Sequence, residues 1–242
     1  MTLLKSTQRI AAATCLSAAA FAPAHAEVIT LDFEGILAPA QMEVGIENFY
    51  NGGTSANGTS GTNHGIEFSS NVRALCLNVP GEATCSNTSH GGQGIPGSER
   101  SGLYFVDGDG DRMFMNRAAG FDTRLAFNYS AAYYPGSVGI WSGLNGTGTL
   151  LATLNLAVTP LSGCGPNVGA YCPFISAGTS FSGIAHSVVF GGTANAIVFD
   201  DVTFGSGATP PVTPVPEPET YAMLLGGLGL LGVMARRRQK RG

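Results

Sequence analysis

Short runs of alternating apolar and polar residues, separated by glycine-rich turns, dominate residues 27–207. In the clearest run, residues 123–130, Leu125, Phe127 and Tyr129 would share one face of a strand. Period-two alternation is typical of half-buried β-strands, and no stretch of helical period is long enough to compete with it. Further candidate strands lie at residues 28–33, 65–68, 103–106, 113–116, 137–141, 150–156, 184–190 and 196–204. The pattern predicts an all-β domain, a β-sandwich of jelly-roll-like type.

The first 26 residues have the three parts of a secretory signal peptide. Lys5 and Arg9 form a positively charged n-region, residues 10–21 form an apolar h-region, and Ala24-His25-Ala26 is a small-x-small cleavage site. Cleavage after Ala26 would leave residues 27–207 as one exported domain, called the body below. A lipoprotein anchored at Cys15 is a weaker alternative, because Ala13-Thr14 makes a poor lipobox.

The C-terminal part contains three features in a fixed order. Pro216-Glu217-Pro218 comes first, then the uncharged residues 221–235, then the basic residues 236–241, after a Thr/Pro-rich linker at 208–215. As a helix, residues 221–235 would rise roughly 22 Å at about 1.5 Å per residue. A membrane core is about 30 Å thick, so this segment predicts a single, marginal membrane helix whose basic end stays cytoplasmic.

This tail, residues 216–242, resembles the PEP-CTERM sorting signal of Gram-negative bacteria. The resemblance implies that an exosortase, a membrane-embedded cysteine peptidase-transpeptidase, recognises Pro216, Glu217 and Pro218. It implies an inner-membrane precursor that is processed and then reaches the cell surface or the extracellular space. An ordinary C-terminal membrane anchor is the alternative.

The body also resembles the domains commonly found ahead of such tails, through residues 31–35, 143–148 and 198–204. These domains are generally taken to be carbohydrate-binding-like sandwiches of unassigned role. The resemblance therefore implies a carbohydrate-binding type of sandwich without naming a sugar.

The body is strongly acidic, with five arginines, 14 acidic residues and no lysine, for a formal charge of −9. Nucleic acids and anionic lipid surfaces require a positive partner, so the charge disfavours both. It fits cation binding or simple solubility.

Four carboxylates at the two ends of the body form the first candidate metal site. Asp32 and Glu34 would share one face of the first strand, while Asp200 and Asp201 in the last strand would point to opposite faces. Sandwiches often pair their first and last strands, which would bring these oxygens together and favour a structural Ca²⁺. A solvated acidic patch is the alternative.

A second candidate calcium site is Asp107-Gly108-Asp109-Gly110-Asp111, whose alternating carboxylates resemble the start of a calcium loop. The glutamate of an EF-hand would fall on Ala118, so the run is not that motif. Asp-Gly pairs also simply make hairpin turns.

Aromatic residues supply the candidate sugar contacts. Tyr133 and Tyr134 lie in an apparent loop before Pro135-Gly136, and two adjacent rings cannot easily both be buried. Trp141 ends a candidate strand and is a third candidate, although such a tryptophan belongs more often to a core.

Four cysteines remain after signal removal, and export makes disulfides the default. Cys76 with Cys85 and Cys164 with Cys172 are the favoured pairs, because each brackets a turn-rich segment, although three pairings are open. Zinc is disfavoured because these spacings are wider than those of zinc motifs.

Catalysis finds little support, because there is no G-x-S-x-G run and His64, His90 and His186 are far apart in sequence. The sequence therefore predicts a non-catalytic surface or extracellular-matrix protein, processed by an exosortase and associated with exopolysaccharide or biofilm. A purely structural surface protein without a ligand is the main alternative. A secreted carbohydrate-active enzyme built on paired carboxylates is a lesser one.

Overall fold

A computed structural model describes residues 28–38, 41–77, 100–107, 110, 112–160, 171 and 174–206. The predicted signal peptide, linker, sorting tail and membrane helix lie outside these residues. Within the described ranges, no helix is long and apolar enough to cross a membrane.

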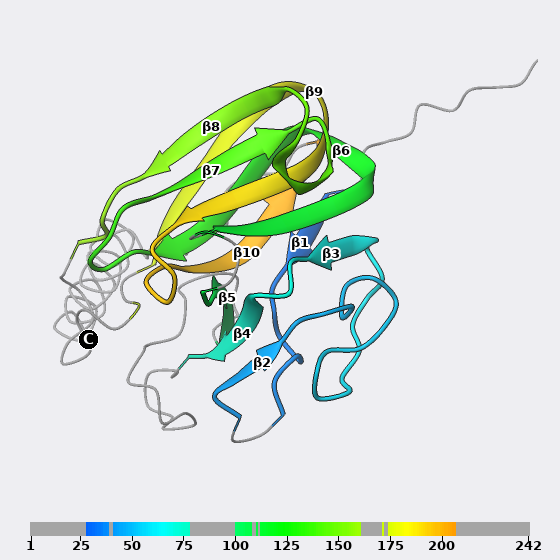
Figure 1. Cartoon of the computed structure of the whole chain (residues 1–242), viewed down its shortest axis with the longest axis vertical. Coiled ribbons are helices and arrows are strands. Elements are labelled where there is room, and N and C mark those ends of the chain that lie inside the picture. The colour runs from blue at the N-terminus through cyan, green and yellow to red at the C-terminus, as the bar shows by residue number, and fades with distance from the viewer. Residues whose placement is uncertain are drawn as a thin grey trace, which may run out of the picture.

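The described residues form an all-β, antiparallel architecture, as the alternation predicts (Figure 1). The only helical element among them is one 3₁₀ turn, η1 (Leu144–Gly146). The strands are β1 (Ile29–Leu31), β2 (Glu43–Gly45), β3 (Ile66–Phe68), β4 (Val72–Cys76), β5 (Ser101–Phe105), β6 (Arg112–Ser130), β7 (Gly136–Trp141), β8 (Leu150–Leu156), β9 (Ile175–Gly192) and β10 (Val198–Phe204).

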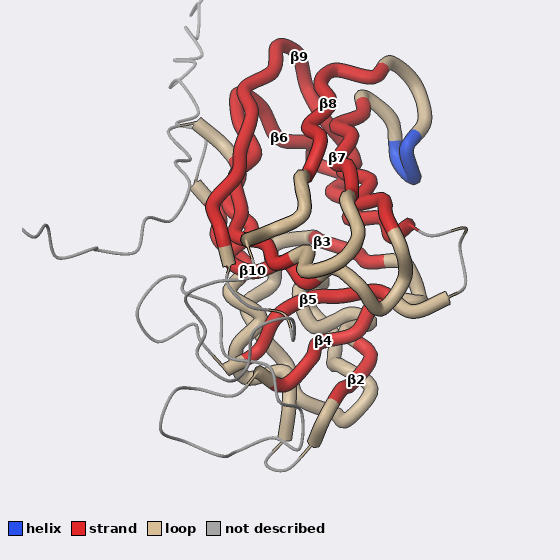
Figure 2. The backbone as a smooth tube through the Cα atoms, turned by 90° about the vertical axis from the view of Figure 1, so that its left-hand side faces the viewer, coloured by secondary structure: helices blue, strands red, loops and turns tan. Residues whose placement is uncertain are grey.

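The ten strands belong to one continuous sheet with the order β2-β4-β5-β10-β6-β9-β7-β8. β1 pairs with β10, and β3 pairs with β6. Two long strands, β6 and β9, run along much of the sheet and curve strongly (Figure 2).

The bend in β6 and β9 folds the sheet over on itself. The first part of β6, Arg112 to Asn116, pairs with the second part of β9, and the later part of β6 pairs with the first part of β9 and with β10. The register shifts between Asn116 and Phe121, and Gly120 in this break has a φ of +73°. Bulges and glycines of this kind let a strand bend sharply.

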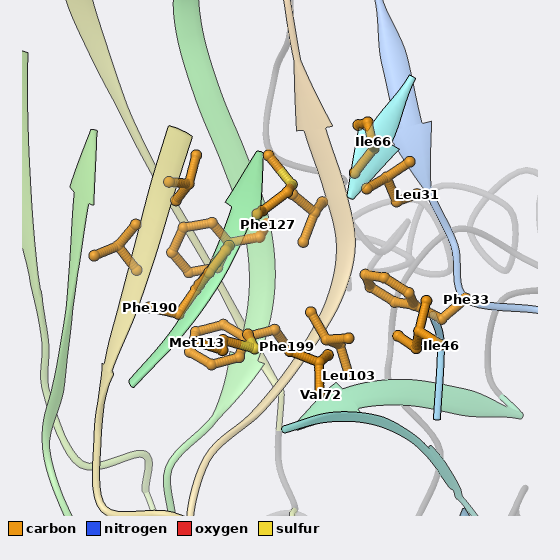
Figure 3. Packing of buried hydrophobic residues seen from close by; sticks show 14 of the residues in the cluster. Leu31, Phe33, Ile46, Ile66, Val72, Leu103, Met113, Phe127, Phe190 and Phe199 are labelled. Carbon is orange, nitrogen blue, oxygen red and sulfur yellow. The ribbon is translucent and has the colours of Figure 1, made fainter. Parts of the chain in front are cut away.

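Aromatic side chains fill the space between the folded halves. Phe190 of β9 lies 6.0 Å from Phe127 of β6 and 4.7 Å from Phe199 of β10, ring centre to ring centre and edge-on. Figure 3 shows these three rings packed together with Met113, all fully buried. The larger of the two hydrophobic clusters among the described residues is therefore enclosed by two parts of the same sheet, which confirms the predicted sandwich.

The ends of the body lie together at one end of β10. Ile29 of β1 lies opposite Phe204 of β10, so the predicted pairing of the first and last strands is confirmed. At the other end of β10, Val198 lies opposite Ser130 of β6. We call these the proximal end (Ile29, Phe204) and the distal end (Ser130, Val198).

Candidate functional sites

The first candidate site surrounds the aspartate pair of β10. Asp200 and Asp201 are both fully buried. Asp201 has a φ of +49°, and the register with β6 shifts between Asp200 and Thr203. The regular alternation used to place these two side chains on opposite faces is therefore interrupted by a bulge.

Asp201 is held by polar groups from two neighbouring strands. Asn128 of β6 donates a hydrogen bond from Nδ2 to Asp201 Oδ2 at 3.0 Å, and Ser176 of β9 donates to Asn128 Oδ1 at 2.7 Å. Thr203 donates from Oγ1 to the Asp201 carbonyl oxygen at 3.0 Å. The Asn128 bond gives the buried carboxylate a partner, Ser176 holds Asn128 in place, and the Thr203 bond satisfies the Asp201 backbone carbonyl.

Asp200 is less well satisfied. Its Oδ1 accepts a hydrogen bond from the Asp201 N–H at 2.8 Å, whereas its buried Oδ2 has no hydrogen-bond partner. Burial raises the pKa of Asp200 well above its usual value, and the charge of Asp201 raises it further, followed by smaller effects of Glu34 and Asp32. The side chain therefore favours its protonated form unless a cation compensates it.

Glu34 joins the first strand region to β5. Its Oε1 accepts hydrogen bonds from the N–H groups of Arg100 at 2.8 Å and Ser101 at 3.0 Å. Burial nevertheless raises the pKa of Glu34, and Asp32 adds to the effect. Asp32 in turn accepts the Glu34 N–H at 3.2 Å.

Tyr50 is a member of this cluster that the sequence pattern does not reveal. Its hydroxyl oxygen accepts the Phe33 N–H at 2.9 Å, and its ring is buried. Burial raises the pKa of Tyr50 well above its usual value, with smaller contributions from Asp32, Asp200 and Glu34. Tyr50 lies in the irregular segment after β2, where no spacing links it to the terminal strands.

The structure thus brings the terminal carboxylates close enough to raise the pKa of Asp200. Among the described residues, however, no three His, Cys, Asp or Glu side chains are arranged so that they could hold a metal ion by themselves. Any cation here would need further oxygen ligands, such as backbone carbonyls or water, which Ca²⁺ commonly uses.

Two other predicted sites lie largely outside the described residues. Of the Asp-Gly run, only Asp107 and Gly110 are described, while Asp109 and Asp111 are not. Cys76 ends β4, and Cys85, Cys164 and Cys172 are not described. The second calcium site and the disulfide pairing therefore stay predictions, as does recognition of Pro216, Glu217 and Pro218 by an exosortase.

The tyrosine pair lies at the distal end, between β6 and β7. Tyr133 is 63% exposed and Tyr134 is 52% exposed, as their adjacency predicts. The start of their loop is anchored, because Thr159 donates from its N–H to the Ala131 carbonyl at 2.9 Å and accepts the Ala131 N–H on Oγ1 at 3.2 Å. Two exposed rings are therefore carried by a loop whose base is fixed.

Trp141 does not join this pair. It is half-buried at the far end of β7, whereas Tyr133 and Tyr134 precede the first residue of that strand. The length of β7 corresponds to about 17 Å at roughly 3.3 Å per residue. The three predicted sugar-contacting aromatics therefore do not form one surface.

Comparison with known proteins gives one specific match. Residues 214–238 match the family described as the PEP-CTERM protein-sorting motif. No curated protein matches the sequence significantly.

Solved structures show only distant similarity. The K2 cleaved adhesin domain of Lys-gingipain is 13% identical, with a TM-score of 0.36, covering 74% of this chain and 98% of that one. The K1 cleaved adhesin domain of Lys-gingipain from Porphyromonas gingivalis W83 is 14% identical, with a TM-score of 0.34 and coverages of 77% and 94%. The catalytic domain of a GH87 α-1,3-glucanase, in complex with tetrasaccharides, is 15% identical with a TM-score of 0.34. It covers 63% of this chain, which spans 30% of the glucanase structure.

Proposed function

Because this chain carries a PEP-CTERM protein-sorting motif, we propose that it is a non-catalytic exported protein of the cell surface or extracellular matrix, processed by an exosortase, whose body binds exopolysaccharide. The observation that carries the polysaccharide part is the exposed pair Tyr133 and Tyr134 on an anchored loop.

Exposed tyrosine rings suit a sugar ligand for a physical reason. A tyrosine presents a flat apolar face and a hydroxyl at its tip, so it can stack on the apolar face of a pyranose and still bond its hydroxyl groups. Leaving two adjacent rings in water forgoes hydrophobic stabilisation of about 25 cal/mol for each Å² of apolar surface. Covering these rings with a sugar would recover part of that free energy.

The position of the pair also supports this function. Both ends of the body lie at the proximal end, and the sorting tail follows the β10 side of that end in the sequence. The tyrosine loop follows Ser130 at the distal end. The tyrosine loop therefore lies at the end of β10 opposite the one from which the chain continues toward the sorting motif.

The test is a glycan array probed with the processed protein. We expect binding to one class of polysaccharide, lost in Tyr133→Ala/Tyr134→Ala and kept in Tyr133→Trp, which preserves a stacking face. Val158→Ala is the matched control, because Val158 is exposed and apolar but not aromatic and lies next to Thr159 at the same end. Absence of binding to any glycan, or binding unchanged by removal of both rings, would favour a structural surface protein without a ligand.

Binding through these rings should not depend on salt. Residues 125–199, which include the tyrosine loop, contain no Asp, Glu, Lys or Arg, so this segment itself supplies no formal charge for ionic adsorption. Ionic adsorption weakens as salt screens the charges, whereas stacking does not. Array binding that disappears at high salt would therefore point to charge and not to the rings.

We also propose a structural Ca²⁺ between the terminal strands, near Asp200. The buried Oδ2 of Asp200 lacks a hydrogen-bond partner, and Asp201, Glu34 and Asp32 contribute further negative charge. A bound Ca²⁺ would compensate this charge and stabilise the pairing of β1 with β10. Thermal melting of the protein after chelation, with and without added Ca²⁺, checks this proposal.

A further inference from the structure

The formal charges of the body lie on both sides of a long uncharged segment of the chain. Between Arg124 and Asp200 there is no Asp, Glu, Lys or Arg, so β7, β8 and β9 carry none of these residues. These three strands are neighbours at one side of the sheet. The charge of −9 therefore comes entirely from the rest of the body.

β8 is the edge strand of this uncharged side. It pairs with β7 only, from Leu156 opposite Gly136 to Leu150 opposite Trp141, and no other described strand lies on its outer side (Figure 1). An edge strand presents a row of backbone N–H and C=O groups to any chain that can pair with it.

Natural edge strands are usually protected by charge, proline, a bulge or short length. β2, at the opposite end of the strand order, has three residues and begins at the exposed Glu43. β8 has seven residues, Leu-Leu-Ala-Thr-Leu-Asn-Leu, without charge or proline. Its only irregularity with β7 is a register shift at the Leu150 end.

Exposed apolar side chains lie at both ends of β8. Leu150 begins the strand, Leu144 lies in η1 just before it, and Val158 follows its last residue by two positions. All three are more than 40% exposed. Exposed apolar groups beside an edge strand without charge or proline are typical of an interaction surface.

We propose that β8 pairs with β8 of a second copy of this chain, antiparallel, so that the sheet continues from one molecule into the next. A second copy fits because a strand paired antiparallel with itself obeys a two-fold axis, which makes the interface self-complementary. Two bodies of charge −9 repel each other, and contact through the uncharged sides keeps their carboxylates apart.

Thr153 offers a sharp test, because it is the middle residue of β8 and its side chain is exposed. Symmetric pairing would place the two Thr153 side chains opposite each other. Like charges in opposite positions of an antiparallel pair are destabilising, and opposite charges are stabilising.

The experiment is sedimentation of the processed protein over a range of concentrations. We expect the wild type to dimerise with increasing concentration, and both Thr153→Lys and Thr153→Glu to weaken dimerisation by up to roughly fivefold. An equal mixture of the two variants should dimerise again, because Lys then faces Glu. Thr54→Lys and Thr54→Glu are matched controls at an exposed threonine outside the uncharged strands and should dimerise like the wild type.

Comparing Thr153→Lys with Thr153→Glu separates this proposal from an effect of net charge alone. If net repulsion alone controlled association, Thr153→Lys would strengthen it. A wild type that stays monomeric at every concentration would overturn the proposal and would favour pairing of β8 with a strand of another protein instead. Dimers that persist in both variants, or mixing that restores nothing, would also overturn it.

Discussion

At the scale of single residues, the burial of Asp200 adds a pH-dependent contribution to the stability of the body. Burial, and then the charge of Asp201, raise the pKa of Asp200 in the folded state, and burial raises the pKa of Glu34 in the same direction. In the unfolded chain an aspartate has a pKa of about 3.9. These two carboxyl groups therefore stay protonated to a higher pH in the folded state than in the unfolded chain. The stability that this gives the folded state is complete below the unfolded pKa and is lost as the pH rises through the folded pKa.

We therefore predict that, in the presence of a chelator, the free energy of unfolding decreases as the pH rises from about 4 toward 7. Asp200→Asn is neutral at every pH and of similar size, so it should flatten this decrease. Urea denaturation at a series of pH values measures it. Asp122→Asn, which removes one carboxylate elsewhere, should keep the slope of the wild type.

Calcium adds a second readout to the same variants. If Asp200 binds Ca²⁺, added Ca²⁺ at neutral pH should raise the stability of the wild type and of Asp122→Asn, but not that of Asp200→Asn. An equal gain in all three proteins would show that Asp200 is not a ligand. A pH slope that Asp200→Asn leaves unchanged would show that its titration does not control stability.

At the scale of elements, the bend shared by β6 and β9 gives the sandwich its shape. Gly120 lies in the register break of β6, with a φ of +73°. A Cβ at this position would lie 2.5 Å from Ile184 Cγ2 and 3.2 Å from the Ala185 carbonyl oxygen of β9. The bend therefore needs glycine both for its backbone conformation and for the close approach of β9.

We predict that Gly120→Ala lowers the free energy of unfolding by about 2–5 kcal/mol, the sum of left-handed backbone strain and overpacking. Gly58→Ala is the matched control: its φ is +86°, but a Cβ there would meet nothing within 4 Å. It should cost only about 1–2 kcal/mol. Urea denaturation measures both.

A double variant, Gly120→Ala/Ile184→Ala, tests the contact itself. Removing the Ile184 side chain beyond Cβ should recover part of the loss, because the atom that blocks the new methyl group is gone. Equal losses in Gly58→Ala and Gly120→Ala would show that the close packing at the bend contributes nothing.

The strands that could be predicted from sequence are those with clear alternation. The alternation predicts two separate strands at residues 113–116 and 123–130, but both belong to β6. Arg117 to Gly120 break the alternation, because this part of the strand is bent and partly exposed. β2, β4 and the first part of β9 were missed: β2 is three residues long, and Ile175 to Ser180 include few large apolar residues.

The candidate sites, like the strands, could be predicted from sequence only in part. Pairing of the terminal strands could be predicted from a general property of sandwiches, and it brings Asp32 and Glu34 near Asp200. The bulge at Asp201 and the contact of Tyr50 with Phe33 could not be predicted from the sequence, because both depend on tertiary packing and follow no local spacing.

At the scale of the whole molecule, the two ends of the body have different surroundings. The chain enters and leaves at the proximal end, and Tyr133 and Tyr134 lie at the distal end. The seven residues of β10 separate the two ends by about 20 Å, at roughly 3.3 Å per residue. The proposed polysaccharide contacts and the strand that leads toward the sorting motif therefore lie at opposite ends of β10.

Mass spectrometry of the protein recovered from outside the cell tests most directly whether the chain is exported and processed at its PEP-CTERM motif. We predict a mature protein that begins at Glu27 and lacks the basic residues 236–241. Replacing Pro216, Glu217 and Pro218 with alanine should leave an unprocessed precursor in the membrane. Exported protein that still carries residues 236–242 would contradict processing at this motif.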